Sequence, residues 1–467
     1  MSNENGRSES EMASTGKMIS YSFGDIVAYY LLGAYNVFIF FFYEVEVGMP
    51  LVLIGLALII FAIWNAVNDP LIGYLTDRPF KRTKKWGMRF PWILIGAFPT
   101  LLFFFLIFTP PDIDVSRNPW PVFLYMVITL CLFDTFYTLF TVHFWGSFTN
   151  HFRSDEERRK AAVYDNIIPA LGAFTLGIIP PLFIVFGKRE SYTLAAFIVV
   201  IIMLICIFIT IPGVRESEEL KEIFIHSSES KEDTSFFKTM REIFREKNVK
   251  AMFISLFLLT IGSALSSASG LYFYKDILGL PYSFAVLTAI ASFSAFIISV
   301  PFWALVAKKI GHAQTYILGI FLVSLAYIPF IWITTIEEAI IFSFLGGIGQ
   351  GAFWYMILAV LADINDEIAL ARGIRQEATV FGVQRFFERL AFILQAVILV
   401  IIHLITGYNP DPSAKQAPLA ILGIRLHLAL IPCIFSFIGF LVMYKWFDLK
   451  GEKKERIFAE LEERGLK

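Results

Sequence analysis

The 467-residue sequence has little charge, and it has almost no cysteine. Only 17% of its residues are charged and 57% are hydrophobic, with a mean hydropathy of +0.66. Soluble domains hold about 45–50% apolar residues and about 25% charged residues. A chain of this composition has more apolar surface than a globular core can bury. The composition therefore argues against an ordinary soluble protein and predicts an integral membrane protein.

The few cysteines and the missing motifs exclude several classes of site. Cys131, Cys206 and Cys433 all lie within apolar runs, which argues against disulfides and against a metal cluster. The sequence contains no Walker phosphate loop, no HExxH helix and no nucleophile elbow. A net charge of −1 gives no indication of a nucleic-acid partner. We therefore expect no enzyme, no cofactor and no nucleic-acid partner.

Long apolar runs recur along the whole chain. A helix needs about 20 apolar residues to cross a bilayer. We predict an all-α integral membrane fold with twelve transmembrane helices, over residues 19–43, 51–76, 90–109, 121–149, 161–187, 193–212, 250–276, 281–307, 313–335, 338–363, 378–406 and 420–445.

Lysine and arginine are distributed unevenly about these spans. One side, with both tails and the central loop, collects 31 of the 39 basic residues, and the other side has six. Because basic loops stay in the cytoplasm, we expect a multi-pass protein of the cell membrane with both termini cytoplasmic. Residues 1–18 are predicted to be a disordered tail, 213–249 a linker with an amphipathic helix, and 447–467 a second tail.

An internal repeat divides the spans into two sets. "PLIGYLTDR" begins at Pro70 and "PFWALVAKK" begins at Pro301, an offset of 231 residues, or about half the chain. Each copy ends the second span of its set. The repeat predicts two pseudo-symmetric six-helix halves, 19–212 and 250–446, which is the arrangement of major facilitator transporters.

The residues around the first copy resemble a known family. "NAVNDPLIGYLTDR" followed by "RFPWILIG" is similar to the signature of the glycoside–pentoside–hexuronide cation symporters, the melibiose-permease-like members of the major facilitator superfamily. Trp145 matches a tryptophan of the family's helix 4, and Gln384 and Arg389 match its helix 11. The resemblance implies a secondary active transporter that moves a sugar, a glycoside or a related polar or amphipathic solute by alternating access, with Na⁺ or H⁺ as the candidate coupling ion.

Several alternatives stay open. The sodium-dependent lysolipid transporters of eukaryotes resemble the same family, so the solute could be a lysolipid, and an uncoupled uniporter would share the fold. A membrane-embedded enzyme, a scramblase or a sensor would belong to another class. The enzyme would need a clustered catalytic set near one interface, which the sequence does not offer. We expect a monomer whose partners are the lipid bilayer and a small-molecule substrate.

Ionisable residues inside the spans are candidates for the coupling site, because a charge at mid-bilayer costs at least about 2.5–3.5 kcal/mol. Asn65 and Asp69 lie one turn apart on one helix face, next to a proline that can kink the helix. We hypothesise that Asp69 pairs with Arg389 across the two halves. The alternative is that Arg389 pairs with Glu388 or with Asp134 and that these charges are structural.

Two positions depart from the family's cation site. The resemblance implies carboxylates at the positions of Asn65 and Thr141, so sodium coupling is in question. Asp134, two turns before Thr141, could be a displaced carboxylate that carries a proton, or it could pair with a tyrosine or an arginine. The candidate coupling set is Asn65, Asp69, Asp134, Thr141 and Arg389.

Aromatic and amide side chains supply the candidate substrate site, although most of these aromatics could instead pack between helices. Trp145 could stack on a sugar ring, whereas Tyr29 and Asn166 replace an aspartate and an arginine of the family. The predicted substrate residues are Tyr29, Asn36, His143, Trp145, Asn166, Trp354 and Gln384. Asp77 and Arg78 end the second span in the superfamily's gate signature, and Asp363 is a candidate gate partner. These charges could also serve only to set the topology.

Overall fold

The computed structural model of the chain describes residues 13–76, 83–218, 220–221, 244–372 and 377–463. Within these ranges, the side chains of a few residues, Asp69 and Arg385 among them, lie outside the description. Every regular element of the described part is a helix. Contacts divide the chain into two compact units, Met1–Glu232 and Asp233–Lys467.

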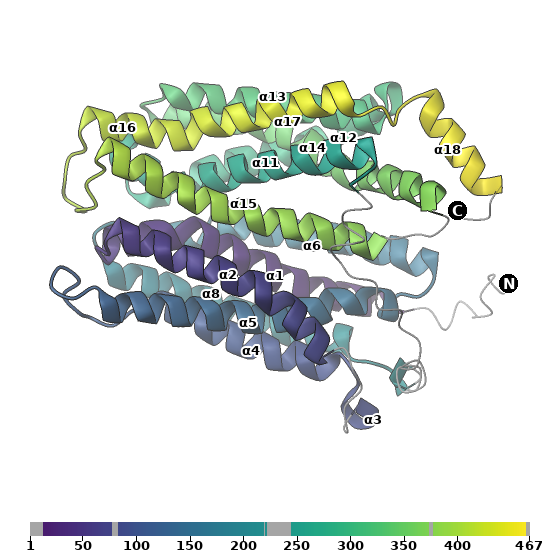
Figure 1. Ribbon diagram of the computed structural model, residues 1–467, viewed down its shortest axis with the longest axis horizontal. Helices are drawn as coiled ribbons and strands as arrows, with labels where there is room; N and C mark the ends of the chain where they lie inside the picture. Colours follow the sequence, from purple (N-terminus) through teal and green to yellow (C-terminus); the bar gives the residue numbers. More distant parts are fainter. Residues whose placement is uncertain (1–12, 77–82, 219, 222–243, 373–376, 464–467) are drawn as a thin grey trace. The chain divides into compact units, whose positions relative to one another are not determined.

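Among the described residues, twelve helices are long and apolar enough to cross a membrane, and the first unit contains six of them. A short helix, α3, follows the second of them (Figure 1). The elements are α1 (Thr15–Phe41) with its π-helical extension η2 (Phe42–Glu46), α2 (Leu51–Thr76), α3 (Thr83–Trp86), α4 (Phe90–Ile107), α5 (Trp120–His151), α6 (Asp155–Leu176), α7 (Ile179–Phe183) and α8 (Arg189–Val214).

The second unit contains the other six membrane-length helices. A further helix, α18, ends the described chain. The elements are α11 (Lys247–Tyr272) with η4 (Phe273–Leu278), η5 (Tyr282–Phe284), α12 (Ala285–Ile310), α13 (His312–Tyr327) with η6 (Ile328–Ile331), α14 (Ile336–Arg372), α15 (Glu377–Thr406), α16 (Pro418–Arg425) with η7 (Leu426–Leu430), α17 (Ile431–Trp446) and α18 (Glu452–Glu463).

The apolar runs form helices because hydrocarbon offers no hydrogen-bond partners, and a helix pairs its backbone N–H and C=O groups with one another. Large apolar side chains remain on the outside of both units, among them Val52 at 63% exposed, Ile298 at 69% and Ile405 at 72%. Surfaces of this kind suit a lipid environment. The predicted all-α fold with twelve transmembrane helices is confirmed.

The helix starts show where the sequence prediction was too short. α1 begins at Thr15, so residues 15–18 of the predicted tail are helical, and the Ser14 hydroxyl accepts from the Lys17 N–H at 3.3 Å. α6 begins at Asp155, six residues before the predicted span, because Ser154 and Glu157 form a capping box. The first turns of these two helices are polar or charged, so a search for apolar residues does not include them. The predicted linker helix lies outside the described residues except at its end.

Close helix packing within each unit depends on glycine. α4 packs on α5 in the first unit, and α12 packs on α14 in the second. A Cβ at Gly96 would lie 2.4 Å from the backbone nitrogen of Phe140, and one at Gly347 would lie 2.1 Å from the carbonyl oxygen of Ser292. Neither position has room for a side chain, so these glycines let the helix backbones approach each other.

Candidate functional site

Asp134 of α5 is the centre of a polar cluster in the first unit. Its side chain is only 3% exposed. The Asn65 side-chain amide donates to Oδ1 at 2.5 Å, and the Asn68 amide donates to Oδ2 at 3.0 Å. Two neutral donors from α2 therefore bind both oxygens of one buried carboxyl group. An ionised carboxyl group only accepts hydrogen bonds, so these amides match it.

The α2–α5 contact fixes this geometry. Asn65 and Asn68 are three residues apart, so their side chains share one face of α2. One residue before Asn65, the Trp64 indole N–H lies 3.1 Å from both the Cys131 carbonyl and the Thr135 hydroxyl. The indole thus anchors α2 to α5 beside the carboxyl group.

The structure brings together some of the predicted coupling residues. Asn65 and Asp134 are in contact, and Asn68, which the prediction omitted, completes the pair of donors. Thr141 is buried, and its hydroxyl donates to the Tyr137 carbonyl at 2.9 Å. The side chain of Asp69 lies outside the described residues, so its pairing with Arg389 stays a prediction.

A second polar cluster in the first unit contains the predicted substrate residue Trp145. Its indole N–H donates to Asp25 Oδ1 at 2.8 Å, and the Tyr29 ring lies 6.0 Å from the indole at an angle of 42°. The Ser22 hydroxyl donates to Asp165 Oδ1 at 2.5 Å. The carboxyl group of Asp165 interacts with that of Asp25. Two interacting carboxyl groups favour holding one proton between them, because each disfavours a negative charge on the other.

Sequence reasoning missed Asp25 and Asp165. Asp25 is 5% exposed on α1, and Asp165 directly precedes the predicted residue Asn166 on α6. The sequence did carry a signal for both residues, because an acid inside a membrane span has a high free-energy cost unless it has a partner or a function. Their contact could not be predicted, because it depends on how α1 packs against α6.

The remaining predicted residues of the first unit make local contacts. The Asn36 amide donates to the Leu32 carbonyl at 2.7 Å, and the exposed Asn166 amide donates to the Ala162 carbonyl at 2.6 Å. His143 is buried, and its Nε2 lies 2.7 Å from the Thr76 hydroxyl at the end of α2. His143 therefore connects α5 to the last turn before the predicted gate.

Trp354, Gln384 and Arg389 belong to the second unit. The Trp354 side chain is 57% exposed, and its ring lies edge-on to Phe353 at 5.2 Å. Gln384 donates to Glu388 Oε1 at 2.9 Å, one turn along α15. Arg389 is half-buried on the same helix.

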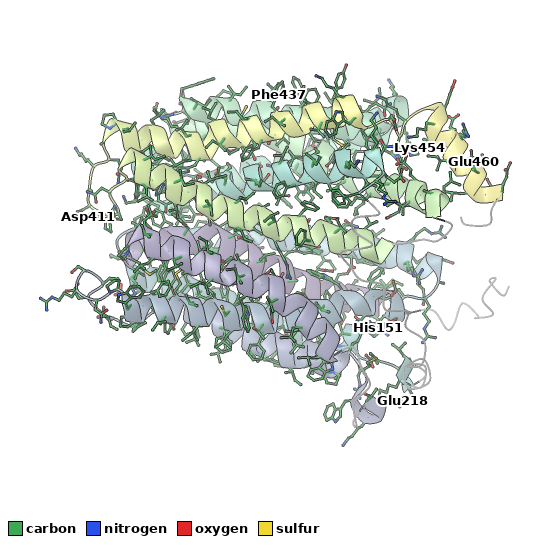
Figure 2. The ribbon with its side chains drawn as sticks, viewed as in Figure 1. His151, Glu218, Asp411, Phe437, Lys454 and Glu460 are labelled. Atoms are coloured by element: carbon green, nitrogen blue, oxygen red, sulfur yellow. The ribbon has the colours of Figure 1, made fainter. Side chains whose placement is uncertain are left out.

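Of the predicted gate residues, Asp77 and Arg78 lie outside the described residues. Asp363 of α14 contacts α18, whose Lys454 Nζ lies 2.6 Å from Asp363 Oδ2. Lys453 of the same helix contacts both Glu367, at 3.0 Å, and Asp448, at 2.6 Å. These contacts dock the C-terminal helix against the end of α14, and Figure 2 shows Lys454 and Glu460 on α18.

The Lys453 contacts shift two ionisation equilibria outside the spans. Burial opposes ionisation of Asp448, but hydrogen bonds from Lys453 and Asn248 outweigh it and lower the pKa of Asp448. Burial likewise disfavours the charged Lys453, but its bonds to Asp448 and Glu367 raise the pKa of Lys453. Each partner therefore favours the charged form of the other.

Glu216 closes the corresponding end of the first unit, just after α8. Its carboxylate accepts from the N–H groups of Met88 and Arg89, each at 2.7 Å, at the start of α4. Gly87 has a φ of +89°, and a Cβ there would lie 2.1 Å from Glu216 Oε2. The carboxylate therefore caps α4 only because position 87 is a glycine.

In the part of the chain that the structure describes, twelve membrane-length helices form two units with buried carboxyl groups among them, an arrangement typical of multi-pass membrane transporters. The model of the MFS/sugar transport protein family matches residues 20–450, so the chain belongs to that family. The predicted family, the major facilitator fold and the transport function are thereby confirmed. The chain is a secondary transporter of small solutes, and since the family is one of transporters, it is not an enzyme.

Individual proteins agree with this assignment. The chain is similar to a glucuronide carrier protein homolog of Escherichia coli K12, with 22% identity over 96% of this chain and 95% of that protein. It is also similar to the sodium-dependent lysophosphatidylcholine symporter 1-A of Danio rerio, with 23% identity over 84% of this chain and 78% of that protein. Its fold resembles the crystal structure of a D-xylose–proton symporter, with a TM-score of 0.61, 12% identity and coverage of 93% and 98%.

Proposed function

We propose that the protein carries a sugar or a glycoside across the cell membrane together with protons, by alternating access between its two halves. We further propose that it works as a monomer with both termini in the cytoplasm. The cluster of Asp25, Asp165 and Trp145 carries this proposal, because it combines two interacting carboxyl groups with an aromatic surface. The concentration of 31 of 39 basic residues on one side supports the orientation.

The residues around Trp145 suit a polar ring. Trp145 is half-buried and Tyr29 is 39% exposed, so both rings can be reached. The C–H face of a sugar packs against such rings, and its hydroxyls donate to a carboxyl group such as that of Asp25. The Escherichia coli relative is a glucuronide carrier homolog, which also supports a sugar-like solute.

Two features favour the proton as the coupling ion. The interacting carboxyl groups of Asp25 and Asp165 can hold one proton between them next to the proposed sugar site. At Asp134, amide N–H groups of Asn65 and Asn68 face the carboxyl group, so donors already occupy the positions that a sodium ion would take. We propose that Asp69, Thr141 and Arg389 complete the coupling set, and that Asp69 pairs with Arg389 across the halves.

We propose that the inner gate uses Asp77 and Arg78 of the first half and Asp363 of the second. The docking of Lys454 onto Asp363 supports a role for α18 in holding that acid. A lysolipid is the second candidate solute, because the chain also resembles a lysophosphatidylcholine symporter over 84% of its length.

Reconstituted transport tests the proposal. The purified protein in liposomes is given radiolabelled glucuronides, disaccharides and lysophosphatidylcholine, with an inward gradient of H⁺ alone, of Na⁺ alone, or of neither. We expect one sugar-like compound to accumulate with the H⁺ gradient and a protonophore to abolish that accumulation. Accumulation driven by Na⁺ alone would contradict proton coupling, and uptake of the lysolipid alone would contradict the sugar assignment.

A further inference from the structure

Two histidines face each other in the second unit, away from every residue used above. His403 lies in the last turn of α15, and His427 lies in the π-helical turn η7. Their Nε2 atoms are 3.1 Å apart, and the side chains are only 2% and 0% exposed. The connection between α15 and α16, which carries Asp411, lies at the end of this unit opposite α18 (Figures 1 and 2).

The neighbouring serine determines where the protons of the pair lie. The Ser269 hydroxyl donates its hydrogen to the Leu265 carbonyl at 2.5 Å. Its oxygen therefore accepts from His427 Nδ1, also at 2.5 Å. A neutral His427 with a hydrogen on Nδ1 has a bare Nε2, which accepts from the Nε2–H group of His403. A proton added to His427 would set two N–H groups against each other.

The surroundings of His403 suit a cation. The Tyr408 ring stacks on the His403 ring at 4.4 Å and 23°, and Tyr272 meets it edge-on at 4.9 Å. The Tyr408 hydroxyl donates to Asp276 Oδ2 at 2.9 Å. Asp276 in turn pairs with the buried Lys275 at 2.8 Å. An aromatic face attracts a positive charge, so an added proton on His403 is stabilised while His427 stays neutral.

The other titratable groups near the pair come from several elements. Arg425 of α16 donates to the carbonyls of Ile331 and Ile333, so its charge is already engaged. The elements packed against α15 and η7 contribute Tyr272, Tyr327, Arg425 and Cys433. η4, which packs on α11 and α16, adds Tyr274, Lys275 and Asp276, and the loop after α15 adds Tyr408. Lys275 and Asp276 balance each other in charge, which leaves the histidines as the groups whose ordinary titration range is near neutral pH.

We propose that the His403–His427 pair is a proton-binding site that takes one added proton, on His403, and excludes a second. Its ligand is the proton, and the site is independent of the solute and of the carboxyl groups of the first unit. A second proton would break the Nε2–Nε2 contact and separate η7 from α15. The unfolded chain can protonate both histidines, so acid pH favours the unfolded chain by one proton.

Two measurements on the full-length protein in nanodiscs test this site. Ring ¹⁵N signals of the chain's six histidines are followed from about pH 4 to about pH 9, and H403Q and H427Q assign the pair. We expect one added proton on the pair, with the His427 Nδ1–H signal retained throughout. Uptake of two protons, or of none, over this range would overturn the proposal, and this wild-type result does not depend on whether the variants fold.

Thermal unfolding against pH supplies the second measurement. With one proton fewer in the folded state, the folding equilibrium constant should fall about tenfold for each pH unit of acidification below the ordinary histidine range. H427Q should lose this component, since the remaining His403 is no longer opposed. H312Q is the matched control, because the His312 side chain is 46% exposed at the other end of the unit, and it should behave like the wild type. Equal pH profiles for the wild type and H427Q would overturn the proposal.

Discussion

Asp134→Asn preserves the shape of the side chain at the centre of the coupling site while removing one acceptor oxygen. The wild-type carboxyl group accepts from Asn65 at 2.5 Å and from Asn68 at 3.0 Å. The new amide offers only one oxygen, so two N–H groups face each other at the second contact. A buried donor left unsatisfied costs about 1–3 kcal/mol. A domain of ordinary stability, about 5–15 kcal/mol, survives that loss, and the variant should fold.

Transport by this variant should fail in a specific way. An amide does not take up and release a proton near neutral pH, so accumulation driven by the H⁺ gradient should disappear. Solute binding should change less than about tenfold, or 1.4 kcal/mol, because the Trp145 cluster makes separate contacts. Both are measured on the same preparation, as proteoliposome uptake and as equilibrium binding of the radiolabelled solute.

Thr135→Val is the matched control. Thr135 is the next residue on α5, and its hydroxyl lies 3.1 Å from the Trp64 indole N–H, which also has the Cys131 carbonyl at 3.1 Å. The control therefore perturbs the same helix contact and keeps the carboxyl group, so gradient-driven uptake should persist. Wild-type accumulation by Asp134→Asn, or equal loss in both variants, would refute the role given to Asp134.

Three further predictions concern other parts of the chain. Asp69→Asn should abolish transport while membrane expression stays normal, and normal uptake by that variant would exclude Asp69 from the coupling set. Gly87→Ala should lower the melting temperature, by at least the equivalent of about 1 kcal/mol, because φ is +89° and the new Cβ would meet Glu216; an unchanged melting curve would contradict the cap. The Asp448–Lys453 contact should stabilise the docking of α18 at neutral pH by no more than about 1 kcal/mol, since the two side chains are 46% and 43% exposed. The pKa of Asp448 is lowered, so its contribution to stability is present above the ordinary aspartate pKa and is lost as pH falls through the pKa of the folded state. The pKa of Lys453 is raised, so its contribution to stability is present below the ordinary lysine pKa and is lost as pH rises through the pKa of the folded state. Proteolysis of the C-terminal helix should therefore accelerate at both pH extremes, and a rate independent of pH would contradict the contact.

The positions of the helices followed from the sequence, because runs of apolar residues long enough to cross a bilayer have few other uses. The predicted second span and α2 agree at both ends, 51–76. The larger errors fall where a helix begins or ends in charged residues. α6 begins six residues early at Asp155 because its capping box, and not apolar content, starts the helix, and α14 continues to Arg372, nine residues past the predicted end. Hydropathy alone does not predict such a helix boundary.

The site could be predicted only in part. Asn65 and Asp134 were found one by one as polar residues in apolar spans, and the structure joins them. The contact of Asp25 with Asp165 could not be found in the same way, since it pairs helices that are 140 residues apart in sequence. Asp363 was expected at the gate, but its contact with Lys454 depends on the docking of a C-terminal helix that the sequence analysis treated as a tail.

The central claim is that protons, and not sodium ions, drive the transport of a sugar-like solute, and that the carboxyl cluster at Trp145 couples the two. The most direct test compares wild type and Asp25→Asn in proteoliposomes under an inward H⁺ gradient without sodium. We predict accumulation by the wild type that a protonophore abolishes, and none by the variant. Accumulation that requires sodium, or that Asp25→Asn retains in full, would contradict the claim.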